Sequence, residues 1–461
     1  MTQRLVIDDA AVATVDTADW RAGAGTEHAH GHVVVDNGVI TAVGHGAAPA
    51  PARAGDEQRR VDGRGALLVT PGLVNTHHHL YQWASRGLAQ QATLFEWLVA
   101  LYPVWAGLDE GIEHAAASAG LAALARSGCT TVADHHYVYP RGGGDLNAAL
   151  VGAAGRVGVR LQLVRGSMDR GRSGGGLPPD DIVEDTEQAL LGTEADIVTY
   201  HDPAPEAMVR VSVGPCSPFS ASRRLMREAA SLARRHGVRL HTHLAETLDE
   251  QEHCLAQFGR TPIDYADELG WLGPDVWLAH GIHFDDGAIE RLGSTGTGVA
   301  HCPSSNARLG AGIARVPDLL AAGSPVGLGV DGAASNEHGG LGDELRQAML
   351  LARLRSGPDA LTARQALWLG TMGGAQCLGR EHELGSIEVG KQADLAVWRL
   401  DGLGQAGIAD PVAALVFGQL PMLELLLVGG RAVVEHGRLS TADESVLAGE
   451  LAVASRRLQA G

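Results

Sequence analysis

Three consecutive histidines, His77, His78 and His79, follow directly on the short apolar segment 73–76. Side chains alternate between the two faces of a β-strand, so His77 and His79 point to the same side if the strand continues through them. Two imidazoles on one side of a strand end are half of a binding site for a metal ion. An expression tag or an exposed histidine cluster is less favoured, because the run is short, internal and preceded by an apolar segment.

Histidine, glutamate and aspartate recur after other apolar segments, as 134–136, His243 with Glu246, His280, and Asp331. Three neutral imidazoles and one carboxylate offer a divalent metal a nitrogen and oxygen shell with one position left for water. A bound zinc ion lowers the pKa of that water to about 7, and a nearby carboxylate can relay the proton. Each residue alone could be an ordinary hydrogen-bonded polar group. The set as a whole favours a metal site whose activated water attacks an electrophilic carbon.

The pattern of residues 66–380 predicts the elements that position these groups. Short apolar segments alternate with stretches of helical period, such as 111–127, 221–236, 250–257 and 286–293. The strand candidates are 73–76, 129–134, 159–165, 209–215, 239–243, 276–280, 298–302 and 326–331. This predicts an α/β fold with a (β/α)8 TIM barrel, in which chemistry occurs at the C-terminal ends of the strands. A doubly wound open sheet is the runner-up, but it would carry a glycine-rich phosphate loop after its first strand, where this chain has histidines.

Both ends of the chain are rich in short β-branched segments. The N-terminal segments are 5–7, 11–15, 32–38 and 40–44, and Asn37-Gly38 is a strong hairpin signal; the C-terminal segments are 385–387, 390–398, 425–430 and 432–434. Neither end is long enough to hold a core alone, so we expect them to pair into one small β-sandwich with the barrel inserted between them. The expected domains are 1–68, the barrel at 69–380, and 381–461 with a terminal helix.

Composition excludes several classes of partner. A net charge of −18 argues against nucleic-acid binding, and the absence of an 18-residue apolar run or a signal-peptide pattern argues against a membrane. The cysteines are scattered and odd in number, which suits free thiols in the cytoplasm better than disulfides; they are Cys129, Cys216, Cys254, Cys302 and Cys377. The expected partner is therefore a small molecule.

Several motifs together resemble the amidohydrolase superfamily, in its mononuclear cytosine/guanine deaminase and chlorohydrolase branch. They are Pro71-Gly72-Leu73-Val74-Asn75-Thr76-His77-His78-His79, His243-Leu244-Ala245-Glu246, Ala279-His280, residues 329–336, and, in the C-terminal β segments, 385–387 and 390–397. The resemblance covers nearly the whole chain, and the motifs are specific as a set. It implies a homo-oligomeric enzyme with one divalent metal ion per chain, for which zinc is expected and iron is the alternative.

The resemblance also implies residue roles. The metal ligands would be His77, His79, His243 and Asp331. His280 would contact the attacking water or the developing oxyanion, and Glu246 would protonate a ring nitrogen. Asp331 would also take a proton from the water and deliver it to the departing nitrogen. His78 lies on the opposite strand face, and His241 ranks below His243 because only His243 has a glutamate at +3.

The only lysine of the chain, Lys391, bears on the number of metal ions. Binuclear members of the superfamily bridge two metals with a carbamylated lysine or a glutamate on strand 4. The expected fourth strand, 209–215, has neither residue, and Lys391 lies far along the chain. The site is therefore expected to hold one metal ion.

Within the branch, residues 75–82, 94–105 and 128–137 resemble the 8-oxoguanine deaminases more than the isoxanthopterin deaminases. Gln82 stands where guanine-type deaminases place a substrate-binding glutamine, whose amide can both donate and accept hydrogen bonds on a purine edge; the alternative is a surface glutamine. Residues 216–220 replace an arginine–aromatic pair of ordinary guanine deaminases. The implied reaction is hydrolytic deamination of a purine-like ring, 8-oxoguanine to urate and ammonia.

Three alternatives remain open at this point: an isoxanthopterin or pterin deaminase, a triazine amino- or chlorohydrolase, and a binding or scaffold protein that has lost its metal. The complete set of ligand residues argues against the last. An aromatic cluster after the first strand, namely Phe95, Trp97, Tyr102 and Trp105, is either core packing or a lid that stacks on a planar heterocycle.

Overall fold

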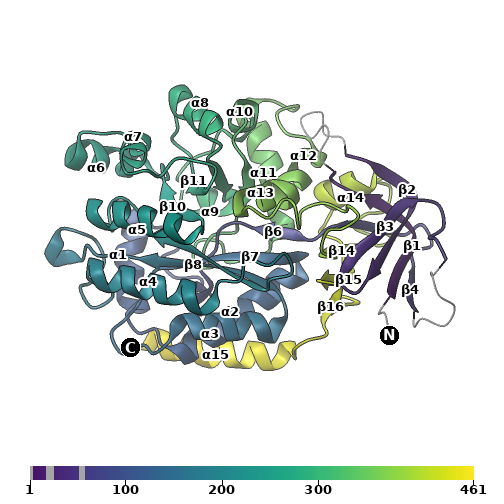
Figure 1. The fold of residues 1–461 in the computed structure, drawn as a ribbon, viewed down its shortest axis with the longest axis horizontal. Helices are drawn as coiled ribbons and strands as arrows, with labels where there is room; N and C mark the ends of the chain where they lie inside the picture. Colours follow the sequence, from purple (N-terminus) through teal and green to yellow (C-terminus); the bar gives the residue numbers. More distant parts are fainter. Residues whose placement is uncertain (1–3, 17–24, 51–57, 461) are drawn as a thin grey trace.

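The computed structural model describes residues 4–16, 25–50 and 58–460. Figure 1 shows a barrel wrapped by helices and, beside it, a smaller β unit that contains strands from both ends of the chain. Residues 1–3, 17–24 and 51–57 of the expected first domain and the final residue of the expected third domain lie outside the described ranges. No helix within those ranges is long and apolar enough to cross a membrane.

The barrel is a closed ring of eight parallel strands. They are β6 (Leu73–Asn75), β7 (Cys129–His136), β8 (Arg160–Ser167), β9 (Val209–Pro215), β10 (Leu240–Leu244), β11 (Val276–His280), β12 (Gly298–His301) and β13 (Val326–Leu328). The ring closes where Leu328 pairs with Asn75. This confirms the TIM barrel and each of its eight expected strands, and it excludes the doubly wound open sheet.

Helices follow most of the barrel strands. Those of the barrel region are α1 (Leu94–Trp105), α2 (Glu110–Arg126), α3 (Leu146–Val157), α4 (Thr186–Tyr200), α5 (Arg223–His236), α6 (Leu248–Phe258), α7 (Pro262–Glu268), α8 (Asp286–Thr295), α9 (Pro303–Arg308), α10 (Val316–Ala322), α11 (Leu341–Ser356), α12 (Ala363–Trp368) and α13 (Gly374–Leu378). Local signals set their ends: α2 begins after Asp109, whose carboxylate accepts two backbone N–H groups, and α5 ends at Gly237 in a left-handed conformation. The four helices predicted from the sequence correspond to α2, α5, α6 and α8.

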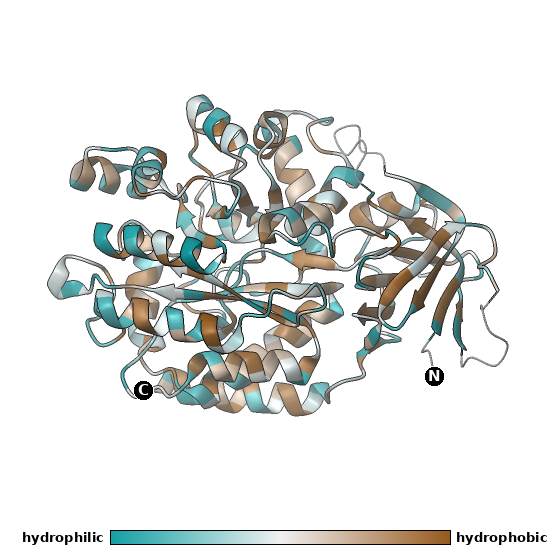
Figure 2. Cartoon of the chain, in the orientation of Figure 1, coloured by the Kyte–Doolittle hydropathy of each residue, from teal (hydrophilic) through white to brown (hydrophobic). Residues whose placement is uncertain are grey.

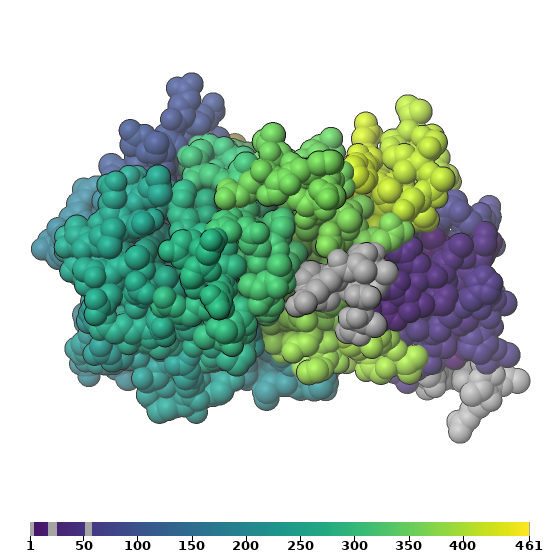
Figure 3. All heavy atoms as spheres, turned by 90° about the horizontal axis from the view of Figure 1, so that it is seen from above, coloured from purple at the N-terminus to yellow at the C-terminus, as the bar shows by residue number. Residues whose placement is uncertain are grey.

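The small β unit is one nine-stranded sheet in which the two ends of the chain join. Its strands are β1 (Arg4–Ala13), β2 (Glu27–Asp36), β3 (Val39–His45), β4 (Gln58–Asp62), β5 (Leu67–Pro71), β14 (Leu395–Arg399), β15 (Leu423–Val428), β16 (Arg431–Glu435) and β17 (Arg438–Leu439). The ends join where β14 pairs antiparallel with β5. Figure 3 shows the purple N-terminal strands beside yellow-green and yellow residues of the C-terminal segment.

The inner face of this sheet holds its own apolar core. Alternate residues of strands from both chain ends meet there, including Leu5, Val35, Val69, Val397 and Leu425. Figure 2 shows these strands largely in brown, the colour of hydrophobic residues. Because each end supplies only part of the core, the unit requires both, as the sequence predicts.

Local details of the β unit differ from the sequence-based expectation. The Asn37-Gly38 hairpin is confirmed, with φ of 51° and 85° between β2 and β3. Segments 5–7 and 11–15 belong largely to the single strand β1, which is interrupted by a bulge near Asp9 (φ 47°). Residues 385–387 form no strand, and 390–394 form a loop whose one bridge joins Gln392 to Val39.

Two further contacts connect the C-terminal segment to the barrel. Arg160 at the start of β8 forms a buried bidentate ion pair with Asp394, at 2.9 Å for each oxygen. The segment also contains α14 (Pro411–Phe417) and ends in α15 (Glu444–Ala460), which lies along α2 and α3 in Figure 1. Arg156 of α3 is bonded to Glu450 of α15.

Candidate metal centre and active site

The C-terminal ends of the barrel strands bring the expected ligand side chains into one buried cluster. His77 and His79 follow β6, His243 lies in β10, and Asp331 follows β13. Ligand atoms of His77, His79 and Asp331 all lie within 4.8 Å of one another. Those of His77, His243 and His280 do so as well. The four side chains singled out by the sequence are therefore neighbours in space.

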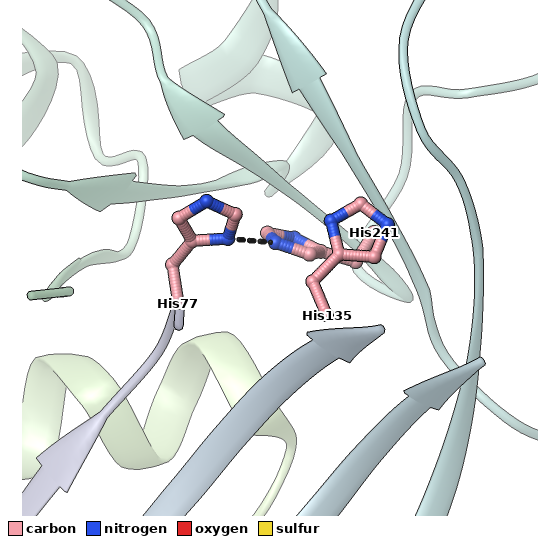
Figure 4. A group of neighbouring side chains, drawn as sticks. All are labelled: His77, His135 and His241. Atoms are coloured by element: carbon pink, nitrogen blue, oxygen red, sulfur yellow. Dashed lines mark hydrogen bonds between the residues drawn. The ribbon is translucent and has the colours of Figure 1, made fainter. Parts of the chain in front are cut away.

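His77 is oriented by His241, as Figure 4 shows. The Nδ1 of His77 lies 2.8 Å from the Nε2 of His241, whose own Nδ1 lies 2.8 Å from the carbonyl oxygen of Trp277. Burial holds the pKa of both imidazoles well below the usual range, so both are neutral. Because the carbonyl only accepts, His241 donates to Trp277 and accepts the hydrogen of His77. The Nε2 of His77 therefore carries a lone pair, and it has no hydrogen-bond partner.

His79 and His243 face each other through ring nitrogens that carry no hydrogen. The Nδ1 of His79 lies 2.7 Å from the carbonyl oxygen of His135, and the Nδ1 of His243 lies 2.6 Å from that of Cys216. Each Nδ1 must donate to its carbonyl, so in the neutral imidazoles each Nε2 has a lone pair. These two Nε2 atoms are 3.2 Å apart.

Asp331 completes the cluster. Its Oδ1 lies 3.3 Å from the Nε2 of both His77 and His79. Its Oδ2 accepts hydrogen bonds from the hydroxyls of Ser305 and Ser335, at 2.5 and 3.2 Å. The hydrogen bonds from the two hydroxyls stabilise the charged form of the carboxyl group. The carboxylate is therefore ionised.

This set of donor atoms fits a divalent metal ion. Three imidazole lone pairs and one carboxylate oxygen converge with no hydrogen between them, an arrangement that is unfavourable in a buried site unless a cation lies among the groups. Each ligand imidazole also has its other nitrogen held by a carbonyl or a second imidazole, as metal-binding histidines typically do. The cluster can therefore hold a metal ion that activates water.

The middle histidine of the run points away from the cluster. The Nδ1 of His78 lies 2.5 Å from the backbone carbonyl oxygen of Asp331, and its Nε2 accepts a hydrogen bond from Trp83 at 3.1 Å. Burial lowers the pKa of His78 to about 3. The expectation that His78 lies on the opposite strand face is confirmed, and its contacts fix the backbone that carries Asp331.

His135, at the end of β7, belongs to the cluster although no role for it was predicted from the sequence. Its ring stacks on that of His243 at 4.9 Å, and its carbonyl holds His79. Its Nε2 lies 2.7 Å from the carbonyl oxygen of Gly214, and its Nδ1 is buried without a partner. The available signal was its position after the second strand candidate, but the sequence did not indicate that this ring would reach His243.

Glu246 and His280 lie beside the expected ligands. The Nε2 of His280 is 3.6 Å from a carboxylate oxygen of Glu246 and 4.0 Å from one of Asp331. Burial, reinforced by the charge of Asp331, raises the pKa of Glu246 well above the usual range, so this carboxyl can hold a proton. Glu250, which the sequence did not single out, accepts the backbone N–H groups of Ala245 and Glu246 at 2.9 Å each and fixes the loop.

The backbone at this edge of the barrel is strained. His280 and Asp331 have φ of 73° and 60°, in the left-handed region that residues with side chains rarely adopt. Such conformations cost about 1–3 kcal/mol each and persist where the surrounding contacts enforce them, commonly at functional sites. Here they direct both side chains toward one point.

A cavity of about 30 Å³ lies beside the cluster. It is lined by His79, Gln82, Leu94, Trp97, Leu98, Tyr102, Tyr137, Cys216, Phe219, His243, Glu246, His280, Leu309 and Asp331. Gln82 lies in the short helix η2 (Leu80–Ser85), where its Oε1 accepts the N–H of Ala334 at 3.3 Å. Its Nε2 is buried without a partner, so its two hydrogens are available to a ligand.

The aromatic residues after β6 have both of the roles considered from the sequence, because some line the cavity and some pack in the core. Trp97 and Tyr102 line the cavity. Phe95 packs against Phe219, another lining residue, with ring centroids 5.2 Å apart. Trp105 is fully buried and does not line the cavity. Helix α1 therefore supplies both core packing and part of the cavity wall.

Comparison with known proteins places this site in a family. Residues 68–433 match the amidohydrolase family. The chain is 45% identical to the 8-oxoguanine deaminase of Pseudomonas aeruginosa, covering 95% of this chain and 96% of that protein. It is 40% identical to an isoxanthopterin deaminase from an unknown prokaryotic organism, covering 83% and 84% of the two chains.

Among solved structures, an atrazine chlorohydrolase from Arthrobacter aurescens TC1 complexed with zinc superimposes with a TM-score of 0.90. It is 33% identical, covering 98% of this chain and all of that chain. The match to the family, the extent of the relatives and the closed barrel agree with one another. This chain belongs to the amidohydrolase family.

Proposed function

We propose that the protein is a metal-dependent hydrolytic deaminase of a purine-like heterocycle that converts 8-oxoguanine and water into urate and ammonia. The observation that carries the proposal is the cavity that His79, His243 and Asp331 line together with the proton-holding Glu246 and with Gln82, whose Nε2 has no partner. The 45% identity to an 8-oxoguanine deaminase over nearly the whole chain supports the choice of ring.

The ligands that we propose for one divalent metal ion are His77, His79, His243 and Asp331. When bound, the ion lowers the pKa of a water molecule and makes it nucleophilic near neutral pH. We propose zinc, with iron as the alternative; zinc is the ion present in the related atrazine chlorohydrolase structure. The expected fourth strand is β9, and neither lysine nor glutamate occurs in it, which supports one ion rather than a bridged pair.

The protein side chains move the protons. Asp331 takes a proton from the attacking water, and Glu246, protonated in its buried position, gives one to the ring nitrogen next to the amidine carbon. His280, which faces both carboxyls, stabilises the oxyanion that develops on that carbon. Asp331 then delivers its proton to the amino nitrogen, which leaves as ammonia, and the remaining proton of the former water returns to Glu246 as the carbonyl forms. Gln82 holds the substrate edge through its free Nε2 hydrogens.

The test is incubation of the metal-loaded protein with 8-oxoguanine, followed by assays of urate and ammonia. Equal amounts of the two products are expected. A high rate with isoxanthopterin and none with 8-oxoguanine would contradict the choice of substrate while preserving the deaminase.

Two alternative substrates, a pterin and a triazine, are each supported by relatives. The isoxanthopterin deaminase supports a pterin ring. A hydroxydechloroatrazine ethylaminohydrolase from Pseudomonas sp. strain ADP, 38% identical over 87% of this chain, and the atrazine chlorohydrolase support a triazine. Release of chloride or an alkylamine from a triazine, without ammonia from 8-oxoguanine, would select the latter.

We also propose a cytoplasmic homo-oligomer that acts on small molecules and binds no nucleic acid. The five cysteines are all buried and free, which suits a reducing compartment, and the net charge of −18 repels phosphate backbones.

A further inference from the structure

A second pocket, of about 210 Å³, lies at the end of the barrel opposite the metal cluster, near the starts of β8, β9 and β10 and the end of α13. We call it the lower pocket; the polar side chains that line it are Gln162, His201, Arg210 and Arg239. An apolar cluster separates it from the histidines: Leu378 lines the pocket, and Trp277 stacks on His241 with ring centroids 4.4 Å apart. Catalysis in a TIM barrel takes place at the other end, so the proposed reaction does not use these residues.

Arginines give the lower pocket an excess of positive charge. Arg210 pairs with Glu383 at 2.7 Å, but the other oxygen of that carboxylate accepts from Arg380 at 2.9 Å, so one negative charge serves two arginines. Arg239 donates through Nε and Nη2 to backbone carbonyl oxygens, which leaves its Nη1, and no described carboxylate pairs with it. None of the described residues that line the pocket is acidic. In a chain of net charge −18, this local excess of cations favours an anionic ligand.

Two donors and one acceptor of the lower pocket are left for a ligand. The Nε of Arg210 and the Oε1 of Gln162 are buried with no hydrogen-bond partner. Gln162 is 3% exposed, and its Nε2 donates to the hydroxyl of Ser212 at 2.7 Å, which leaves Oε1 to accept. The Nδ1 of His201 accepts the backbone N–H of Val211 at 3.1 Å, so its Nε2 carries a hydrogen. Buried polar groups without partners are rare in folded proteins, so this set points to a ligand that supplies the partners.

These groups match an oxyanion that keeps a hydrogen of its own. Guanidinium and imidazole N–H groups bind charged oxygens strongly, and arginine suits phosphate in particular. The Oε1 of Gln162 can only accept, so it requires an O–H on the same ligand. Inorganic phosphate keeps at least one O–H at neutral pH. Sulfate has the same tetrahedral shape and keeps none, so the two anions differ in the one feature that Gln162 recognises.

We propose that the lower pocket is a binding site for inorganic phosphate. Arg210, Arg239 and His201 donate to the oxygens of the anion. The Oε1 of Gln162 accepts the phosphate O–H and excludes sulfate. The site is distinct from the metal cluster, and the proposed deamination does not depend on it.

The experiment is calorimetric titration of the metal-loaded protein with inorganic phosphate and, separately, with sulfate. It compares wild type with Arg239→Gln and Gln162→Glu. Arg239→Gln removes the charge but keeps an amide that can donate to a backbone carbonyl oxygen. Gln162→Glu keeps the size of the side chain and adds a negative charge that repels the anion, while the neighbouring arginines stabilise the new carboxylate. The matched control is Arg235→Gln, the same change at an exposed position of α5 outside the pocket.

Wild type should bind phosphate saturably, and sulfate at least about threefold more weakly, because sulfate has no hydrogen for Gln162. Arg239→Gln and Gln162→Glu should each weaken phosphate binding about tenfold or more, and Arg235→Gln should leave it unchanged. No saturable binding, or sulfate bound as tightly as phosphate, would overturn the proposal. Wild-type affinity in either pocket variant would also overturn it, since the phosphate would then bind elsewhere, for example at the metal. The comparison with sulfate needs no variant, so the test stands even if a variant fails to fold.

Discussion

The Nε2 atoms of His79 and His243 lie 3.2 Å apart, and the hydrogen bonds at each Nδ1 leave both with lone pairs. A cation between them relieves their repulsion and that of the neighbouring Asp331 carboxylate. Removal of the metal by a chelator should therefore abolish turnover and lower the thermal midpoint by several degrees, since a ligand at 100 times its dissociation constant stabilises by about 2.7 kcal/mol. Calorimetry of the chelated and reloaded protein checks this. An identical midpoint in both states would argue against a metal at this cluster.

The contact between His77 and His241 should tune metal affinity. His241→Phe keeps a ring of similar size but removes the acceptor that orients His77. Loss of such an orienting partner typically weakens metal binding 10–100-fold. Competition with a chromophoric chelator measures the dissociation constant, with His382→Ala, at an exposed position, as the control. If His241→Phe bound the metal with the wild-type dissociation constant, the contact with His241 would have no effect on metal binding by His77.

Glu246 should affect chemistry rather than metal content. Glu246→Gln keeps the size of the side chain but cannot transfer the proton, so kcat is expected to fall about 10²–10⁴-fold. The metal content, measured by elemental analysis, should stay at the wild-type value. Glu252→Gln, at an exposed position in α6, serves as the control. A variant that retained wild-type kcat would remove Glu246 from the proton path.

Gln82 should act mainly on substrate binding. Gln82→Ala removes the free Nε2 hydrogens that face the ligand, and one hydrogen bond corresponds to about 3–10-fold in affinity. KM should rise by that factor, with unchanged metal content and a smaller effect on kcat. If instead kcat fell while KM stayed constant, Gln82 would act in the transition state and not in substrate recognition.

Glu113, in α2, should make stability depend on pH. Its carboxyl is fully buried, neither oxygen has a hydrogen-bond partner, and burial, with the nearby Asp134, raises its pKa well above 4.5. The folded protein keeps this proton above pH 4.5 while the unfolded chain releases it, so stability contributed by Glu113 is lost as pH rises from about 4.5 toward the folded pKa.

Glu113→Gln does not titrate and should therefore be more stable than wild type at pH 8, with a difference that shrinks toward pH 4.5. Denaturant unfolding at several pH values measures it, with the exposed Glu290→Gln as the control. A stability difference that does not vary with pH would show that Glu113 is ionised in the folded protein.

The barrel, and the position of the candidate ligand residues at its strand ends, were predictable because their signals are local. Side chains alternate between the two faces of a strand, so the sequence indicates that His77 and His79 share a face. Asp331 and His243 also stand at the ends of expected strands. Eight such segments fix the closed ring, since the C-terminal strand ends of a barrel meet at one edge. The hairpin at Asn37-Gly38 was also predictable from local sequence, because the turn needs positive φ at two adjacent residues.

The remaining features depend on contacts between distant segments. Nothing near His135 in the sequence states that its carbonyl holds His79 or that its ring stacks on His243. Glu250 fixes Glu246 through backbone N–H groups, which any residue type would provide. The bulge in β1 follows similarly from pairing with β2.

The most direct test of a one-metal 8-oxoguanine deaminase is a titration of the chelated protein with zinc while urate formation from 8-oxoguanine is measured. The rate should rise linearly and level off at one ion per chain, with one ammonia released per urate. A plateau at two ions per chain would contradict the single-metal cluster, and no urate at any zinc level would contradict the reaction itself.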